Sequence, residues 1–225
     1  MGSPPRMSIK VGGDYACFSR PEFKAERASY PWITPSAARS IFEAVLWKPE
    51  IRWEIRRIKL LRPVKFTNFR RNEINTKIPP SKAAHGKAEL YTDSDRAQRN
   101  TLALKDVEYI LEADLFLTDK GLAGGENIVK YVEMFQRRLE KGQHFHQPYL
   151  GCREFAARVS PPRGDEDAID ENMDAGLMFY DFSVFPGVDK NGKTKGKAVP
   201  LFFRANMTNG IIEVQPKSEI ERGVS

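Results

Sequence analysis

The chain has 225 residues, of which 36 are lysine or arginine and 30 are aspartate or glutamate, so its net charge is +6. Hydrophobic residues make up 40% of it, which is enough to build a packed core and excludes a wholly disordered protein. No apolar run approaches the roughly 18 residues that cross a membrane, and the N-terminus lacks the apolar stretch of a secretory signal, so we expect a cytoplasmic protein.

The positive charge is concentrated in the N-terminal third of the chain. Residues 1–77 contain 16 lysines and arginines against 7 acidic residues, a net of +9, whereas the remaining 148 residues have a net of −3. This asymmetry favours a surface in the N-terminal part that faces a polyanion such as a nucleic acid.

The segments before residue 75 predict three extended stretches and one helix. Residues 7–18 have the pattern of a strand that runs into a glycine-marked bend. A helix is predicted over 34–47, with Thr34 as its N-cap. A strand over 51–61 and a further extended segment over 62–74 follow, because apolar and polar residues alternate in both.

The next segments alternate between irregular and periodic sequence. Residues 75–100 lack periodicity and are rich in Pro, Ser, Lys and Asp, so we predict a long loop there. Residues 107–117 predict a strand, 124–142 an amphipathic helix and 147–159 another strand. The order of the elements is therefore β-α-β, an arm and loop, then β-α-β, which is the split βαβ or ferredoxin-like pattern.

The C-terminal part differs in pattern. An acidic, proline-marked loop follows residue 159, and residues 177–185 and 198–216 have the pattern of strands. Asn209-Gly210 is the strongest short hairpin signal in the chain.

We therefore predict an α+β protein in two parts. A ferredoxin-like (RRM-like) RNA-binding domain covers 7–159, with an insertion at about 62–100. A small β-rich antiparallel domain with the acidic loop covers 160–225.

No catalytic or cofactor motif is visible, and we expect neither a metal site nor a cofactor. The two cysteines, Cys17 and Cys152, lie in no CxxC pair and are expected to be buried, reduced thiols. His85, His144 and His146 have no identifiable third metal ligand, and they stay as reserve candidates for acid-base chemistry.

Basic and aromatic residues alternate in several stretches of the N-terminal part. Trp47 and Lys48 adjoin one another, and Arg70 and Arg71 follow Phe69. Because adjacent residues of a strand point to opposite faces, at least one of these two arginines should be available to a ligand. Charges of this kind meet phosphates, and aromatic faces stack unpaired bases.

The predicted helix over 124–142 places Lys130 beside Tyr131. One interpretation is a solvated lysine and a boundary tyrosine on a core-packing helix. The other is catalytic: RNA carries its own nucleophile, the 2′-OH, so cleavage needs only proton transfer and a cation for the developing charge.

Several of these segments resemble one family. Residues 13–53, 62–74 and 147–155, together with the "MTNGII" hairpin at 207–212, are similar to the CRISPR-associated Cas-five family, subtype d, of type I-C systems. The resemblance covers most of residues 7–215. It implies a ferredoxin-like domain plus a small β domain, in agreement with the order of the predicted elements.

The resemblance also implies a function and a set of partners. The expected activity is a metal-independent endoribonuclease that cuts precursor CRISPR RNA within its repeat and keeps the 5′ handle of the product bound. The expected partners are the precursor CRISPR RNA, the crRNA 5′ handle, and the backbone and large subunits of the type I-C interference complex. Some relatives also bind duplex DNA.

The family's catalytic trio is Tyr-Lys-His, and this chain matches it at one position. The tyrosine position is Leu46, the lysine position is Lys130, and the histidine position is Tyr131. The first hypothesis is an endoribonuclease with Lys130 as charge stabiliser and Tyr131 as acid, base or orienting group. Trp47, Lys48, Arg70 and Arg71 would hold the RNA.

Arg153 would assist this RNA binding. The second hypothesis is a subunit that binds the crRNA handle with feeble or no cleavage, which Leu46 and Tyr131 favour. A third is a protein that binds duplex DNA without sequence preference, whose affinity would depend steeply on salt.

Overall fold

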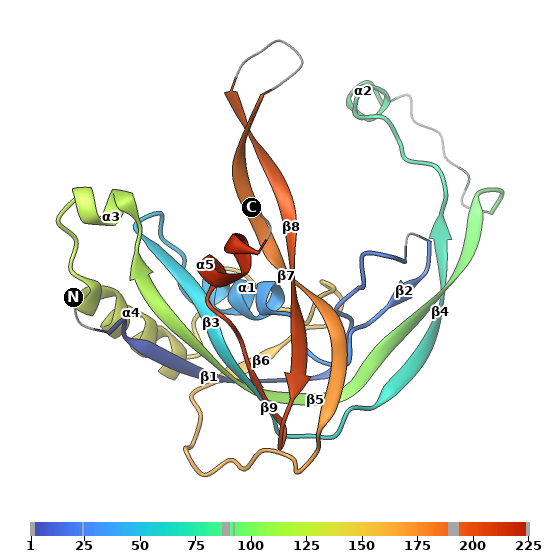
Figure 1. The fold of residues 1–225 in the computed structure, drawn as a ribbon. Coiled ribbons are helices and arrows are strands. Elements are labelled where there is room, and N and C mark those ends of the chain that lie inside the picture. The colour runs from blue at the N-terminus through green and yellow to red at the C-terminus, as the bar shows by residue number, and fades with distance from the viewer. Residues whose placement is uncertain (1–2, 24, 87–90, 92, 189–193, 224–225) are drawn as a thin grey trace.

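The computed structural model describes residues 3–23, 25–86, 91, 93–188 and 194–223. Its centre is a large, mainly antiparallel sheet in the order β6-β1-β5-β3-β9, with β2 and β4 also paired to β5 (Figure 1). The strands of this sheet are β1 (Arg6–Ala16), β2 (Arg27–Ala28), β3 (Ile51–Leu60), β4 (Phe66–Ile74), β5 (Arg96–Leu117), β6 (Arg158–Ser160) and β9 (Ile211–Glu213). The structure is thus a mixed α/β fold with few helices, as expected.

Two long helices pack against this sheet. They are α1 (Pro35–Val45) and α4 (Ile128–Glu140). Thr34 caps α1 as predicted, since its hydroxyl accepts a hydrogen bond from the Ala37 amide at 3.3 Å. Helix α4 is amphipathic as predicted, with Phe135 and Leu139 in the core, but Tyr131, expected at the boundary, is buried with them. The remaining helices are short: α2 (Pro80–Ala84), α3 (Asp119–Ala123) and α5 (Lys217–Arg222).

Strand β5 extends beyond its predicted range. It begins at Arg96 and pairs with β4 from Arg96 to Leu104, so the predicted loop over 75–100 is wrong for its last residues. The local sequence is rich in polar residues and does not predict a strand. The segment is a strand because β4 supplies partners for its backbone hydrogen bonds. The two strands form an arm that rises from the sheet and carries α2 near its end (Figure 1).

The strand predicted over 147–159 is mostly wrong. Only its end belongs to β6, and the preceding residues form tight turns with a single bridge between Tyr149 and Ala156. Gly151 has φ +83°, and a Cβ there would lie 2.0 Å from the Cys17 carbonyl oxygen. This close approach of two backbones requires glycine and prevents a regular strand.

The C-terminal part forms a second, two-stranded sheet from β7 (Met173–Val188) and β8 (Thr194–Met207). Its inner side chains, including Met178, Tyr180 and Phe203, belong to the same hydrophobic core as the large sheet. The division of the chain near residue 160 therefore stays a prediction. No helix in the described residues is long and apolar enough to cross a membrane.

The predicted Asn209-Gly210 hairpin turn is present between β8 and β9. Both residues have positive φ, +48° and +71°, as the two central positions of a type I′ turn require. The turn is closed by reciprocal hydrogen bonds between the backbones of Thr208 and Ile211. It lets the chain leave the β7–β8 sheet and pair with β3.

Gly210→Ala should destabilise the protein more than Gly176→Ala. The two glycines have nearly the same φ, +71° and +69°, so each substitution incurs a left-handed backbone cost of roughly 1–2 kcal/mol. Only at Gly210 would the new Cβ also meet backbone, 2.4 Å from the Ile169 carbonyl oxygen. Chemical denaturation of the two variants measures the difference, and equal losses would contradict this packing.

Candidate active site and nucleic-acid interface

An aromatic cluster fixes α4 against the C-terminal end of α1. The ring centroid of Trp53 lies 5.0 Å from that of Phe42 and 4.7 Å from that of Phe135. The Trp53 indole also donates a hydrogen bond to the Leu46 carbonyl oxygen at 3.0 Å. Phe135 is one helical turn after Tyr131, so this packing places the start of α4 relative to the segment after α1.

Lys130 and Tyr131 share one carboxylate. The Lys130 ammonium lies 2.9 Å from Glu126 Oε2, and the Tyr131 hydroxyl also hydrogen-bonds Glu126. Tyr131 is buried with 2% of its surface exposed, whereas the Lys130 side chain is 54% exposed and lies 5.2 Å from the centre of the Tyr131 ring. The pair therefore consists of an accessible cation beside a largely enclosed phenol.

The same contacts set the protonation of the group. The hydrogen bond from Lys130 to Glu126 raises the pKa of Lys130 above its usual value, and the same bond lowers the pKa of Glu126. Burial, aided by Glu126, raises the pKa of Tyr131. Tyr131 thus keeps its proton at neutral pH and can donate it, but it is a poor base.

A second ion pair adjoins this group. Glu50 lies 3.0 Å from Lys120 of α3, and its carbonyl oxygen accepts a hydrogen bond from the Thr118 amide. Gly121 permits the close approach, since a Cβ there would lie 2.4 Å from the Glu50 carbonyl oxygen. The negative charge of Glu50 contributes to the raised pKa of Lys130, so Glu50 is near Lys130 and Tyr131.

Sequence reasoning missed Glu50, Lys120 and Glu126. The four-residue spacing of Glu126 and Lys130 was the available signal, because residues i and i+4 are neighbours on a helix. The contact between Glu50 and α3 had no comparable signal.

The residues at the end of α1 differ in accessibility. Leu46 is completely buried, so it brings neither a hydroxyl nor an exposed surface to the site. Trp47 is 58% exposed, and Lys48 is exposed beside it. An accessible ring and a cation thus follow directly after Leu46.

The predicted arginines lie elsewhere, on the arm and on the turn that contacts it. Arg70 is exposed on β4, whereas Arg71 pairs with Glu154 and lies 5.7 Å from the centre of the Phe155 ring. Arg153, beside Glu154, is exposed. The structure therefore separates the predicted site residues into two groups, one near α3 and α4 and one at the arm, which lie on opposite sides of the view in Figure 1.

His85 and His144 join neither group, whereas His146 lines a cavity together with Arg153. His85 ends α2, with Nδ1 2.6 Å from the Ser81 carbonyl oxygen, and His144 and His146 are exposed in the segment after α4. Within the described residues, no group of three or more His, Cys, Asp or Glu side chains is arranged to hold a metal ion.

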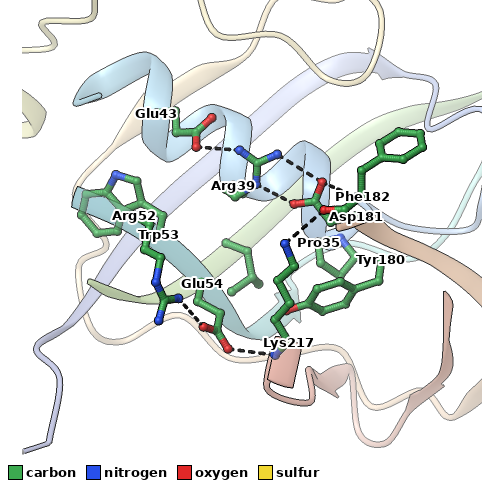
Figure 2. A pocket seen from close by; sticks show the side chains of 11 residues that line it. Pro35, Arg39, Glu43, Arg52, Trp53, Glu54, Tyr180, Asp181, Phe182 and Lys217 are labelled. Atoms are coloured by element: carbon green, nitrogen blue, oxygen red, sulfur yellow. Dashed lines mark hydrogen bonds and ion pairs between the residues drawn. The ribbon is translucent and has the colours of Figure 1, made fainter. Parts of the chain in front are cut away.

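A cavity of about 400 Å³ between α1, β3, β7 and α5 is lined by paired charges (Figure 2). Arg39 bridges Glu43 and Asp181 at 2.6 and 2.7 Å. Glu54 binds Arg52 and the Lys217 amide. Because these charges satisfy one another, they join the C-terminal sheet to α1 and leave little for an ionic ligand.

Comparison with known proteins identifies the family. The family model Cas_Cas5d, described as CRISPR-associated protein (Cas_Cas5), matches residues 7–215. The chain belongs to the Cas5d family. The resemblance noted in the sequence is therefore confirmed.

Two relatives of the Cas5d family are similar over nearly their whole length. The chain is 44% identical over 218 residues to the CRISPR pre-crRNA endoribonuclease Cas5d of Thermus thermophilus, covering 93% of this chain and 91% of that protein. It is 43% identical over 226 residues to the CRISPR pre-crRNA endoribonuclease Cas5d of Mannheimia succiniciproducens, covering 94% and 95%. A crystal structure of a CRISPR-associated protein has the same fold, with a TM-score of 0.68 at 20% identity over 98% of this chain and 97% of that one.

Glu126→Gln should lower the pKa of Lys130 toward its ordinary value, because it removes the carboxylate that stabilises the ammonium. The pKa of Tyr131 should fall less, since its burial remains. NMR titration of isotope-labelled lysine and tyrosine measures both changes. Glu140→Gln, at the exposed end of the same helix, is the matched control and should change neither.

Proposed function

We propose that this chain is an endoribonuclease that cuts precursor CRISPR RNA in the cytoplasm. Its membership of the Cas5d family supports this, together with two relatives, 43% and 44% identical, that are named pre-crRNA endoribonucleases. The observation within the structure that carries the proposal is the pair formed by Lys130 and Tyr131, a cation and a protonated phenol held by one carboxylate.

We also propose that the large sheet is ferredoxin-like. The strand order β6-β1-β5-β3, with each neighbouring pair antiparallel, supports this, as does the succession of strands and helices along the chain. In this classification β2, β4 and β9 are additions, and the arm of β4 and β5 is the insertion.

The proposed reaction uses the 2′-OH of the RNA as nucleophile. It attacks the adjacent phosphorus, the bond to the 5′ oxygen breaks, and the products carry a 2′,3′-cyclic phosphate and a 5′-OH. The proton lost from the 2′-OH balances the one gained by the 5′ oxygen, so no metal ion is required in the scheme. Lys130 stabilises the negative charge of the transition state, and Tyr131, whose pKa is raised, donates a hydrogen bond or its proton to the departing oxygen.

For RNA binding we propose Trp47 and Lys48 near the pair and Arg70, Arg71 and Arg153 at the arm. We further propose that the chain keeps the 5′ handle of the crRNA and joins the backbone and large subunits of a type I-C complex. Duplex DNA is a further proposed ligand.

A second candidate function is handle binding without effective cleavage. Leu46 favours it, because a buried aliphatic side chain supplies no hydroxyl where the resembled trio has one. The ion pair of Lys130 with Glu126 favours it too, since a neutralised ammonium is less available to a phosphate.

Lys130→Ala should reduce cleavage of a CRISPR repeat RNA in EDTA by about 100- to 1,000-fold, the cost of losing one positioned charge stabiliser. Affinity for the uncleaved RNA should change far less, because the arm is intact. Gel analysis with identification of the product ends measures both effects. Lys141→Ala, an exposed lysine at the other end of α4, is the control and should cleave like the wild type.

Cleavage that persists unchanged in Lys130→Ala would remove Lys130 from the mechanism. Tight binding of the handle with the precursor left intact would select the second function instead.

A further inference from the structure

A cavity in the turns between α4 and β6 has no role in the reaction described above. Its volume is about 530 Å³, and its lining comes from His146, Gln147, Tyr149 and Arg153. This volume lies within the roughly 300–1,000 Å³ of pockets that hold small ligands. It is large enough for one nucleotide.

The backbone around this cavity is firmly held. The Phe145 amide donates to the Ala44 carbonyl oxygen at 2.7 Å, which ties the first turn to α1. The Leu150 amide donates to the Phe155 carbonyl oxygen at 2.8 Å, and Cys17 donates to Leu150 at 3.0 Å. The side chains that line the cavity therefore start from fixed positions, which lowers the entropic cost of binding.

The lining combines aromatic rings with an available cation. The His146 ring centroid lies 6.5 Å from that of Tyr149 and 6.3 Å from that of Phe145, whose side chain is 85% exposed. In the described part of the chain no hydrogen bond or ion pair engages the Arg153 guanidinium, and the residue is exposed. Stacking surfaces beside a free guanidinium are the combination that binds unpaired nucleotides.

The residue that follows Arg153 contacts the arm. Glu154, next to Arg153, pairs with Arg71 of β4 and with Arg27. Glu154 thus neutralises Arg71 of the arm and Arg27 of β2, while Arg70 on β4 remains exposed.

We propose that this cavity holds one unpaired nucleotide of the bound RNA, with its base on the rings of Tyr149 and His146 and its phosphate at Arg153. This deepens the proposed function by assigning a nucleotide-binding site away from Lys130. It requires RNA binding by this chain but not cleavage.

The base contact and the phosphate contact have separable effects on the affinity for a short fluorescent oligouridine. Tyr149→Leu should weaken binding roughly five- to 150-fold, the range for loss of one base–aromatic stack, without changing the salt dependence. Arg153→Ala should weaken binding and reduce the slope of log affinity against log salt by about 0.7, the contribution of one phosphate contact. Fluorescence anisotropy over a range of salt concentrations measures both.

Two further variants act as controls. Tyr149→Phe keeps the ring and should bind like the wild type, while Lys141→Ala removes an exposed cation outside the cavity and should change affinity little. Because Tyr149 also packs against neighbouring residues, thermal denaturation checks that Tyr149→Leu is folded, and Arg153→Ala tests the site without changing a packed side chain. With oligouridine that contains 4-thiouridine, irradiation should cross-link the peptide containing His146 and Tyr149, and His146→Ala should reduce the yield.

The outcomes distinguish this proposal from the proposed function. If Tyr149→Leu and Arg153→Ala bind oligouridine like the wild type, the cavity is not a nucleotide site, whether or not the protein cleaves repeat RNA. If both lose affinity while the wild type cleaves nothing, the nucleotide site stands and the endoribonuclease assignment fails. The nucleotide proposal is overturned if oligouridine does not bind the wild type. It is also overturned if the variants lose the ability to bind a protein partner while their affinity for oligouridine is unchanged.

Discussion

The 22-residue strand β5 is the constraint on which the rest of the structure depends. Its second half lies between β1 and β3, where Leu111, Ala113 and Leu115 are completely buried. Its first residues, from Arg96 onward, extend beyond the core and pair with β4 to form the arm. Where β5 ends, α3 brings the chain against Glu50 and then into α4. One strand thus positions both the proposed RNA-binding arm and the proposed catalytic pair.

Local sequence was sufficient where an element is stabilised by its own periodicity or turn chemistry. The threonine cap of α1 and the Asn209-Gly210 turn are cases of this kind, because their signals lie within a few residues. Prediction from local sequence failed where a distant segment decides the conformation. The close contact of Gly151 with Cys17 breaks the strand predicted before β6, and β4 makes a strand of polar residues at the start of β5.

The candidate site shows the same division. Lys130 and Tyr131 were identifiable, but the burial of Tyr131 depends on packing near Phe135, which a single helix cannot reveal. The net charge of residues 1–77 overstated the number of cations that are free to bind a ligand. Arg27, Arg39, Arg52, Arg56, Arg57 and Arg71 all belong to the basic N-terminal part, and all are paired with carboxylates. The net charge of a segment is therefore a weak guide to the cations that remain for a ligand, among which Arg70 and Arg153 are exposed.

The ion pair of Lys130 with Glu126 decides how the proposed site could work. The ammonium is half exposed, and exposed ion pairs contribute little to stability because water and salt screen them. A phosphate, with more negative oxygens in reach, can therefore displace Glu126 at small cost and take the same ammonium. Displacement would also free the Tyr131 hydroxyl from Glu126, while burial continues to keep its proton in place. Under the proposed mechanism, binding of the RNA phosphate would convert a neutralised lysine and an engaged tyrosine into a charge stabiliser and a proton donor.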